Sequence, residues 1–360
     1  MKIVIAGGGT AGHVNPALAL ARALDRDDVV FVGTIEGLEA RLVTAAGFDF
    51  ETIDVVGFDR AAPGSFPKVA ARALGAIRRS RAILSRVRPD VVIGMGGYVS
   101  LPVALAAASR GTPLVLHEQN IVLGLAHKTT KPFARRVAVS FEETLTAVRK
   151  KGVLTGNPVD ADVASLDRAG ARTAASARFG LDPEIATVLA FGGSLGARTI
   201  NQGVMELARL WRDRPDRQIL HITGRSPATQ VEHDGMVDSP RYKSLEFVEP
   251  MADAYAAADV AVARGGASTL AEITAVGLPA LIVPYPHHRD RQQTRHGQVL
   301  EHAGAGIVVP DDAVAGPRLA AELDRMLEPA RLDAMATASR ALGRPDAAQR
   351  LAAVVRESAA

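Results

Sequence analysis

The chain has no cysteine, and only 4% of its 360 residues are aromatic. Without cysteine it can form neither a disulfide framework nor a thiolate metal site. No stretch contains the roughly 20 consecutive apolar residues that would span a bilayer. The apolar run over residues 3–6 is too short for the core of a signal peptide and ends in glycines. These absences exclude a disulfide-stapled domain and restrict any membrane contact to a peripheral one.

The chain also has little net charge. The formal net charge is +3, which is too small to require a nucleic-acid partner, and we expect none. With 48% hydrophobic and 22% charged residues the composition is that of a globular protein, and 360 residues exceed one ordinary core. The composition therefore predicts two domains and leaves the partner open.

Short β-branched runs alternate with helical stretches rich in Ala, Leu and Arg, which predicts parallel sheets covered by helices on both faces. The fold class is therefore α/β. The predicted strands form two series, 2–6, 28–33, 90–94, 113–117 and 136–140 in the first, and 187–191, 218–223, 258–262 and 279–284 in the second.

Glycine and proline punctuate the chain between the two series, at Gly156-Asn157-Pro158. This predicts an N-terminal domain over residues 1–160 and a C-terminal domain over residues 161–360. The last predicted helix, residues 345–358, could pack on either domain.

Four predicted strands run into glycine-rich turns that open helices. We call them the first to fourth glycine loops, residues 7–13, 94–98, 192–196 and 264–269. Glycine permits close backbone approach, and a helix N-terminus offers unpaired N–H groups to an anion. Each loop is a candidate site for a phosphate or a sugar oxygen.

The first glycine loop also matches the G-x-G-x-x-G pattern through Gly7, Gly9 and Gly12, with Glu36 where a ribose-binding acid would follow. An NAD(P)-dependent dehydrogenase is therefore an alternative. One such match is weak evidence, whereas four loops in two halves favour a nucleotide sugar and its acceptor.

Seven motifs, taken in order, resemble the MurG family, the lipid I to lipid II N-acetylglucosaminyltransferases. They are residues 8–14 (GGTAGHV), 94–100 (GMGGYVS), 117–120 (HEQN), 156–159 (GNPV), 192–194 (GGS), 272–273 (EI) and 290–293 (DRQQ). The resemblance implies a GT-B fold, in which two Rossmann-like domains face a cleft. It implies an inverting transfer without metal or cofactor, at the cytoplasmic face of a bacterial membrane.

The same resemblance implies where the substrates bind. In the C-terminal domain it marks Ser194 for the donor diphosphate, Glu272 for the ribose hydroxyls and the Val248 amide for the uracil. It also marks Gln292 and Gln293 for the sugar, and Arg264, Ser268 and Thr269 on the fourth glycine loop. In the N-terminal domain, the acceptor side, it marks Thr10, Ala11, Gly12, Tyr98 and Asn120.

Three positions depart from the family pattern. Asp160 stands where the family often has arginine, which puts one phosphate contact in doubt, and Ala11 and Leu195 replace a common glycine and a common glutamine.

The transfer requires a base for the attacking hydroxyl. His13 is the candidate, because it lies at the start of a predicted helix whose dipole disfavours the imidazolium. His13 could instead hold the acceptor diphosphate, and Glu118 is the second candidate base. His287 and His288 with Asp290 are typical of a solvated loop, so no metal site is predicted.

Residues 66–88 form a basic segment without acids. Its cations are Lys68, Arg72, Arg78, Arg79, Arg81, Arg86 and Arg88, and apolar residues recur between them at helical spacing, at Phe66, Val69, Ala70, Ala73, Leu74, Ile77 and Leu84. Such a segment can lie on anionic inner-leaflet lipid. The alternative is an ordinary helix with a solvated basic face.

Two further functions remain open. A UDP-N-acetylglucosamine 2-epimerase would have a similar fold, and a nucleotide-sugar binding module would lack turnover.

Overall fold

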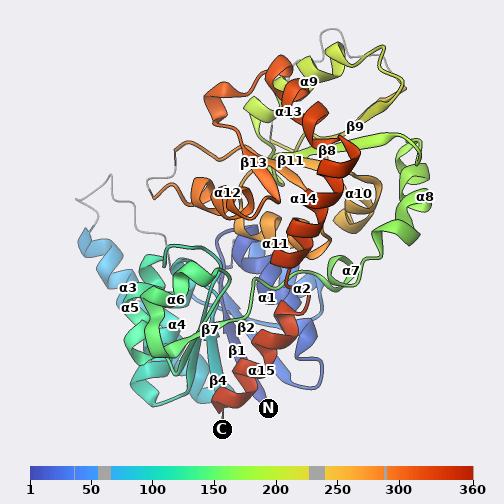
Figure 1. Ribbon diagram of the computed structural model, residues 1–360. Helices are drawn as coiled ribbons and strands as arrows, with labels where there is room; N and C mark the ends of the chain where they lie inside the picture. Colours follow the sequence, from blue (N-terminus) through green and yellow to red (C-terminus); the bar gives the residue numbers. More distant parts are fainter. Residues whose placement is uncertain (36, 56–65, 227–239, 288–289, 360) are drawn as a thin grey trace. The chain divides into compact units, whose positions relative to one another are not determined.

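The computed structural model describes residues 1–35, 37–55, 66–226, 240–287 and 290–359, of which only the backbone is described for residues 66–71. The chain divides into two compact units (Figure 1). Unit 1 contains residues 1–160 together with residues 346–360, and unit 2 contains residues 161–345. The last helix, which the sequence left unassigned, is therefore part of unit 1.

Unit 1 is built on one parallel sheet, in which seven strands are described, in the order β3-β2-β1-β4-β5-β6-β7. Every neighbouring pair is parallel, with Ile3 of β1 opposite Val29 on one side and Val91 on the other. The strands are β1 (Lys2–Ala6), β2 (Asp28–Gly33), β3 (Asp49–Thr52), β4 (Val91–Gly94), β5 (Leu114–Glu118), β6 (Arg136–Val139) and β7 (Gly152–Leu154).

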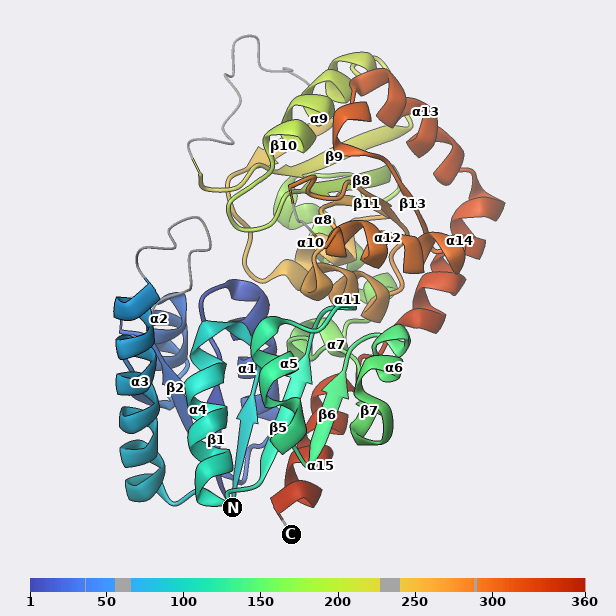
Figure 2. The ribbon, with the colours of Figure 1, turned by 90° about the vertical axis from the view of Figure 1, so that its left-hand side faces the viewer.

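Helices cover both faces of this sheet, because successive side chains of each central strand point to opposite faces. Ile3 and Ile5 pack with α1 and α15, whereas Val4 and Ala6 pack with α3 and α4. Figure 2 shows α3 and α4 beside the strands of unit 1. The helices of unit 1 are α1 (Ala11–Ala23), α2 (Leu38–Ala45), α3 (Phe66–Val87), α4 (Gly97–Arg110), α5 (Leu125–Thr130), α6 (Leu145–Val148) and α15 (Ala347–Ala359).

Unit 2 repeats this plan with six described strands, in the order β10-β9-β8-β11-β12-β13. Leu189 and Phe191 of β8 face one core layer with α10 and α11, and Val188 and Ala190 face the other with α9 and α13. The strands are β8 (Ala186–Phe191), β9 (Arg217–Ile222), β10 (Tyr242–Leu245), β11 (Val260–Ala263), β12 (Ala280–Ile282) and β13 (Gly306–Val308). The helices are α7 (Ala161–Ala164), α8 (Arg168–Phe179), α9 (Arg198–Leu210), α10 (Met251–Ala257), α11 (Ala267–Ala275), α12 (Gln292–His302), α13 (Gly316–Met326) and α14 (Pro329–Leu342).

Both sheets reverse their strand order at one place, between β1 and β4 in unit 1 and between β8 and β11 in unit 2. Ligands of doubly wound sheets bind at the carboxyl ends of the strands at such a switch point. The first and second glycine loops follow β1 and β4, and the third and fourth follow β8 and β11. All four predicted loops therefore lie at the two switch points.

Candidate active site

In unit 1, the first and second glycine loops contact each other closely. A side chain at Gly97 would place its Cβ 2.4 Å from the carbonyl oxygen of Gly8, and Gly97 itself has φ +74°. Only glycine fits there, because both the space and the backbone conformation exclude a Cβ. Tyr98 follows, and its ring lies against Gly9, where an added Cβ would be 2.9 Å from Cε1. The close approach places Tyr98 beside the first loop.

His13 lies in the first turn of α1, which begins after Thr10. Its Nδ1 is 3.0 Å from Thr10 Oγ1, and its Nε2 edge faces Gly96 of the second loop. Burial lowers the pKa of His13, while Glu118 partly opposes that shift. The ring is therefore neutral near pH 7. This direction agrees with the neutral ring expected from the sequence, but its largest cause is burial and not the helix dipole.

Glu118 ends β5, the strand next to β4, and both of its carboxylate oxygens accept hydrogen bonds. Oε1 accepts from the backbone N–H and the side-chain amide of Asn120, at 3.1 and 3.2 Å. Oε2 accepts from the Gly124 N–H and is 2.8 Å from His127 Nδ1. Burial would raise the pKa of Glu118, but these bonds outweigh it and lower the pKa to about 2. Such a carboxylate is a weak base.

His127 was not predicted from the sequence. It is 1% exposed on α5, and its ring lies against Gly96, on which the His13 ring also packs. Its Nδ1 pairs with Glu118, and its Nε2 has no hydrogen-bond partner among the described residues. A single histidine without a partner at a recognisable spacing forms no motif, so the sequence offered no signal. The structure adds it to Glu118 and His13 as a third ionisable group of the cluster.

Glu39 on α2 is the second residue that the sequence did not reveal. It is 1% exposed and accepts hydrogen bonds from the backbone N–H groups of Gly9 and Thr34, at 3.1 and 3.0 Å, and from the Thr34 hydroxyl at 2.7 Å. Burial would raise its pKa, but these bonds lower it. Glu39 thus remains ionised and fixes the first glycine loop. The predicted ribose-binding acid of a dinucleotide enzyme, Glu36, lies outside the described residues.

The other two residues of the His117–Asn120 motif support the structure. His117 Nε2 donates to the Gly156 carbonyl at 3.1 Å, and Gln119 donates to Met95 O at 2.8 Å. Both side chains are buried, and burial lowers the pKa of His117 to about 4. The motif therefore contributes Glu118 and Asn120 to the site and anchors it through the other two.

In unit 2, the third glycine loop is held by its backbone. Gly196 N donates to Gly193 O at 2.9 Å, and Arg225 N donates to Ser194 O at 3.2 Å. Gly224 lies against the loop, where a Cβ would be 2.2 Å from Gly196 N. Ser194 is exposed, and Leu195, the residue that stands in place of the family's common glutamine, is 70% exposed. The loop presents backbone and the Ser194 hydroxyl to solvent at the start of α9.

Glu272 is half-buried on α11, and its Oε2 accepts a hydrogen bond of 2.6 Å from the hydroxyl of Tyr255.

Arg264 is the first residue of the fourth loop, and its guanidinium donates hydrogen bonds to Asp311 and to the carbonyls of Val283 and Pro284. Arg264, which was predicted to contact substrate, thus has its guanidinium hydrogen-bonded within the protein.

The remaining predicted donor residues lie near the same edge of the unit 2 sheet. Gln293 contacts Gly265 of the fourth loop and accepts from Tyr285 N at 2.9 Å, and Gln292 donates to Asp290 at 3.0 Å. Ser268 and Thr269 are partly exposed in the first turn of α11, and Val248 is buried.

Asp160, which belongs to unit 1, pairs with Arg22 of α1. In place of the arginine that is common in the family, this chain has a carboxylate that forms an ion pair within unit 1.

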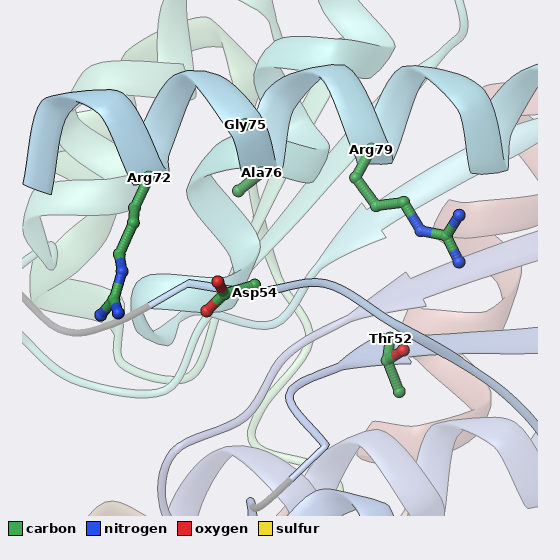
Figure 3. A pocket seen from close by; sticks show the side chains of 6 residues that line it. All are labelled: Thr52, Asp54, Arg72, Gly75, Ala76 and Arg79. Atoms are coloured by element: carbon green, nitrogen blue, oxygen red, sulfur yellow. The ribbon is translucent and has the colours of Figure 1, made fainter. Parts of the chain in front are cut away.

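The described part of the basic segment is a helix packed on the sheet. Leu84, part of the predicted apolar stripe, is 1% exposed in the core, so it is not available to lipid; Leu74 is 58% exposed. Arg72 and Arg79 extend from α3 into a shallow pocket of about 340 Å³ (Figure 3). The pocket is lined by Thr52, Asp54, Arg72, Gly75, Ala76 and Arg79. Part of the predicted apolar stripe is therefore core, whereas the arginines of this helix, Arg72, Arg78, Arg79, Arg81 and Arg86, are exposed.

None of the described helices is long and apolar enough to cross a membrane, and no cluster of three His, Asp or Glu among the described residues could hold a metal. His287 is exposed, and His288 lies outside the described residues.

Comparison with known proteins shows that each half of the chain matches a known family domain. Residues 3–139 match the glycosyltransferase family 28 N-terminal domain, and residues 187–351 match the glycosyltransferase family 28 C-terminal domain. With two doubly wound parallel sheets, the chain is a glycosyltransferase of the GT-B fold class.

Full-length relatives narrow this class. Proteins from Nocardioides sp. and Streptomyces coelicolor are each 41% identical, over 99% and 100% of this chain and 98% and 99% of theirs. Both are named UDP-N-acetylglucosamine--N-acetylmuramyl-(pentapeptide) pyrophosphoryl-undecaprenol N-acetylglucosamine transferase. The crystal structure of Acinetobacter baumannii MurG has a TM-score of 0.79 and 27% identity, covering 99% of both chains. The chain belongs to the MurG family.

A UDP-N-acetylglucosamine 2-epimerase structure, described as putative, from Listeria monocytogenes has a TM-score of 0.71 over 99% of this chain and 96% of its own. Its identity is 15%, so it shares the fold alone. The epimerase alternative is therefore the weaker one.

Proposed function

We propose that the chain transfers N-acetylglucosamine from UDP-N-acetylglucosamine to the 4-hydroxyl of the muramyl sugar of lipid I, giving lipid II and inverting the anomeric centre. The observation that carries the proposal is the 41% sequence identity, over nearly the full length, to transferases whose printed name describes this reaction. The reaction serves peptidoglycan synthesis.

Unit 1 supplies the chemistry toward the acceptor. The 4-hydroxyl attacks the anomeric carbon, the bond from that carbon to the diphosphate oxygen breaks, and His13 takes the hydroxyl proton. A neutral imidazole can do this at pH 7, whereas a carboxylate with a pKa of about 2 is a much weaker base. Glu118 instead holds His127 and Asn120 beside His13. Thr10, Ala11, Gly12 and Tyr98 border the same place and would contact the acceptor.

Unit 2 holds the donor. The third glycine loop, with Ser194, would bind the diphosphate at the start of α9, where helix N–H groups stabilise negative charge as UDP leaves. Glu272 would accept hydrogen bonds from the ribose hydroxyls, and the Val248 amide would bond the uracil. Gln292 and Gln293 would read the sugar. Ser268 and Thr269 lie at the start of α11, whereas Arg264 acts by fixing the fourth loop to Asp311.

We place the enzyme peripherally at the cytoplasmic face of the bacterial membrane, since its acceptor is lipid-linked. Arg72 and Arg79, which extend from α3 around one shallow pocket, support contact with anionic lipid headgroups. Binding to anionic rather than neutral vesicles, lost at high salt, tests this contact. We propose no nucleic-acid partner and no cofactor.

The activity is tested by measuring UDP release from UDP-N-acetylglucosamine with and without a lipid-linked muramyl-peptide acceptor. A transferase releases UDP only with the acceptor, whose mass increases by one N-acetylhexosamine. Acceptor-independent conversion to another UDP-sugar would instead identify an epimerase. Donor binding without either product would identify a binding module.

A further inference from the structure

Tyr255 is a buried tyrosine whose hydroxyl donates a hydrogen bond to Glu272, the proposed ribose-binding residue. Tyr255 lies on α10 and is 0% exposed, whereas Glu272 lies on α11 and is half-buried. The O–H donates to Oε2 at 2.6 Å, which is short and typical of a bond to an ionised acceptor. Burial and the adjacent carboxylate both raise the pKa of Tyr255 well above its ordinary value. The hydroxyl is therefore a donor at every physiological pH.

The same ring also contacts the strand that leads to the third glycine loop. Phe191, the last residue of β8, meets the Tyr255 ring edge-on, with ring centroids 6.2 Å apart and an interplanar angle of 65°. Gly192 follows Phe191 directly. One rigid side chain thus packs on the base of the proposed diphosphate loop and bonds the proposed ribose acceptor. Tyrosine suits this position because only two side-chain torsions have to be fixed.

We propose that Tyr255 is a positioning residue that orients Glu272 to read the cis-diol of the donor ribose. A free glutamate rotates about three torsions, and orienting it on binding costs entropy. The bond to Oε2 fixes the carboxylate plane before the nucleotide arrives. A site built to bond substrate hydroxyls discriminates strongly against analogues that lack them, provided that its polar groups are held in place. This inference rests on the proposed function, because it assigns the ribose to Glu272.

The test compares Tyr255→Phe with the parent chain in calorimetric binding of UDP and of 2′,3′-dideoxy-UDP. The readout is the discrimination ratio, the Kd for the dideoxy nucleotide divided by the Kd for UDP. We expect Tyr255→Phe to lower this ratio by roughly five- to fiftyfold, because a carboxylate that is no longer held keeps only part of its charged hydrogen bonds to the ribose hydroxyls. The KM for UDP-N-acetylglucosamine should rise by a similar factor with kcat nearly unchanged.

Tyr242→Phe is the matched control. Tyr242 belongs to the same unit, and its hydroxyl is 2.8 Å from Nδ1 of the buried His221, so the variant also removes one tyrosine hydroxyl from an internal hydrogen bond. Its discrimination ratio should equal that of the parent. Glu272→Asp is the second variant, because it withdraws the carboxylate from Tyr255 and leaves the buried ring in place. It should lower the ratio even if Tyr255→Phe folds poorly.

Three results would overturn the proposal. If Tyr255→Phe keeps the parent's ratio while Glu272→Asp lowers it, the hydroxyl does not position Glu272, although Glu272 still reads the ribose and the proposed transfer stands. If Tyr255→Phe weakens both nucleotides equally, its role is only structural. If the parent itself binds both nucleotides equally, Glu272 does not read the ribose, and the proposed donor site fails together with this inference. The acceptor-dependent release of UDP decides the activity separately.

Discussion

The first and third glycine loops occupy equivalent places in their units but are fixed by different means. Carboxylates and rings hold the first: Glu39 accepts its Gly9 N–H, Tyr98 covers it, and His13 lies at its end. The third is held by backbone hydrogen bonds, such as that from Arg225 N to Ser194 O. A loop surrounded by ionisable side chains is suited to moving a proton. A loop of exposed backbone at a helix start is suited to binding an anion. One loop geometry thus serves two kinds of chemistry.

Substitution of His13 is the strongest way to break this comparison. If unit 1 supplies the base, His13→Ala should lower the single-turnover rate at saturating acceptor by about 10² to 10⁴. Donor affinity, measured by calorimetry, should remain that of the parent, because the proposed donor loops lie in unit 2.

A His13→Ala rate within about threefold of the parent would end the base assignment. A raised acceptor KM with normal kcat would show instead that His13 binds the acceptor, for example its diphosphate.

The ionisable groups near the first loop should also make the stability of unit 1 depend on pH. The pKa of His117 is about 4 in the folded chain and its ordinary value is 6.5, so the unfolded chain binds the extra proton between these values. The free energy of unfolding should therefore fall by about 3 kcal/mol as the pH falls from 7 to 4.

Denaturant titrations at pH 7, 5.5 and 4 measure this dependence. His117→Gln keeps a donor for Gly156 O and should reduce the pH dependence, whereas His302→Gln, at an exposed histidine of unit 2, should not. An identical slope in parent and His117→Gln would contradict the assignment.

The smallest effect is expected at Ser194. If the backbone of the third loop binds the donor diphosphate, Ser194→Ala should weaken UDP binding by only about 1.5 kcal/mol, the low end for a hydrogen bond to a charged group, because Ser194 is exposed. Gly193→Ala should weaken it more, because Gly193 has φ +88° and alanine would distort the loop. Calorimetry on both variants makes the comparison. A larger loss for Ser194→Ala than for Gly193→Ala would show that the side chain dominates.

The sequence predicted the central strands of both sheets and missed four others, β3, β7, β10 and β13. All four lie at sheet edges. An edge strand is buried on fewer sides, so it needs no continuous apolar run: β3 reads Asp-Phe-Glu-Thr and β10 reads Tyr-Lys-Ser-Leu. β7 and β13 are apolar but only three residues long, which is too short to show a periodicity. The central strands are buried on both faces and therefore carry the signal.

The candidate site also contains residues that the sequence could predict and residues that it could not. The glycine loops are visible in the composition, and His13 was predicted with the first of them, whereas Ser194 and Glu272 were predicted from the resemblance to a family. Glu39, His127 and Tyr255 were not, because a single acid or ring on a helix has no spacing that reveals what it will contact. Their importance comes from tertiary contacts, which only the fold supplies. The roles of all these residues in binding and catalysis remain predictions.

The position of α15 in unit 1 has a consequence for synthesis of the chain. Leu351, Ala352 and Val355 complete the core layer beside α1, and Arg356 pairs with Asp27. These residues follow the whole of unit 2 in the sequence. At about 5 to 20 residues per second, a ribosome needs roughly 10 to 40 seconds to pass through unit 2. During that time the apolar surface of nascent unit 1 that α15 will cover stays open to chaperones, while unit 2, made without interruption, can fold first.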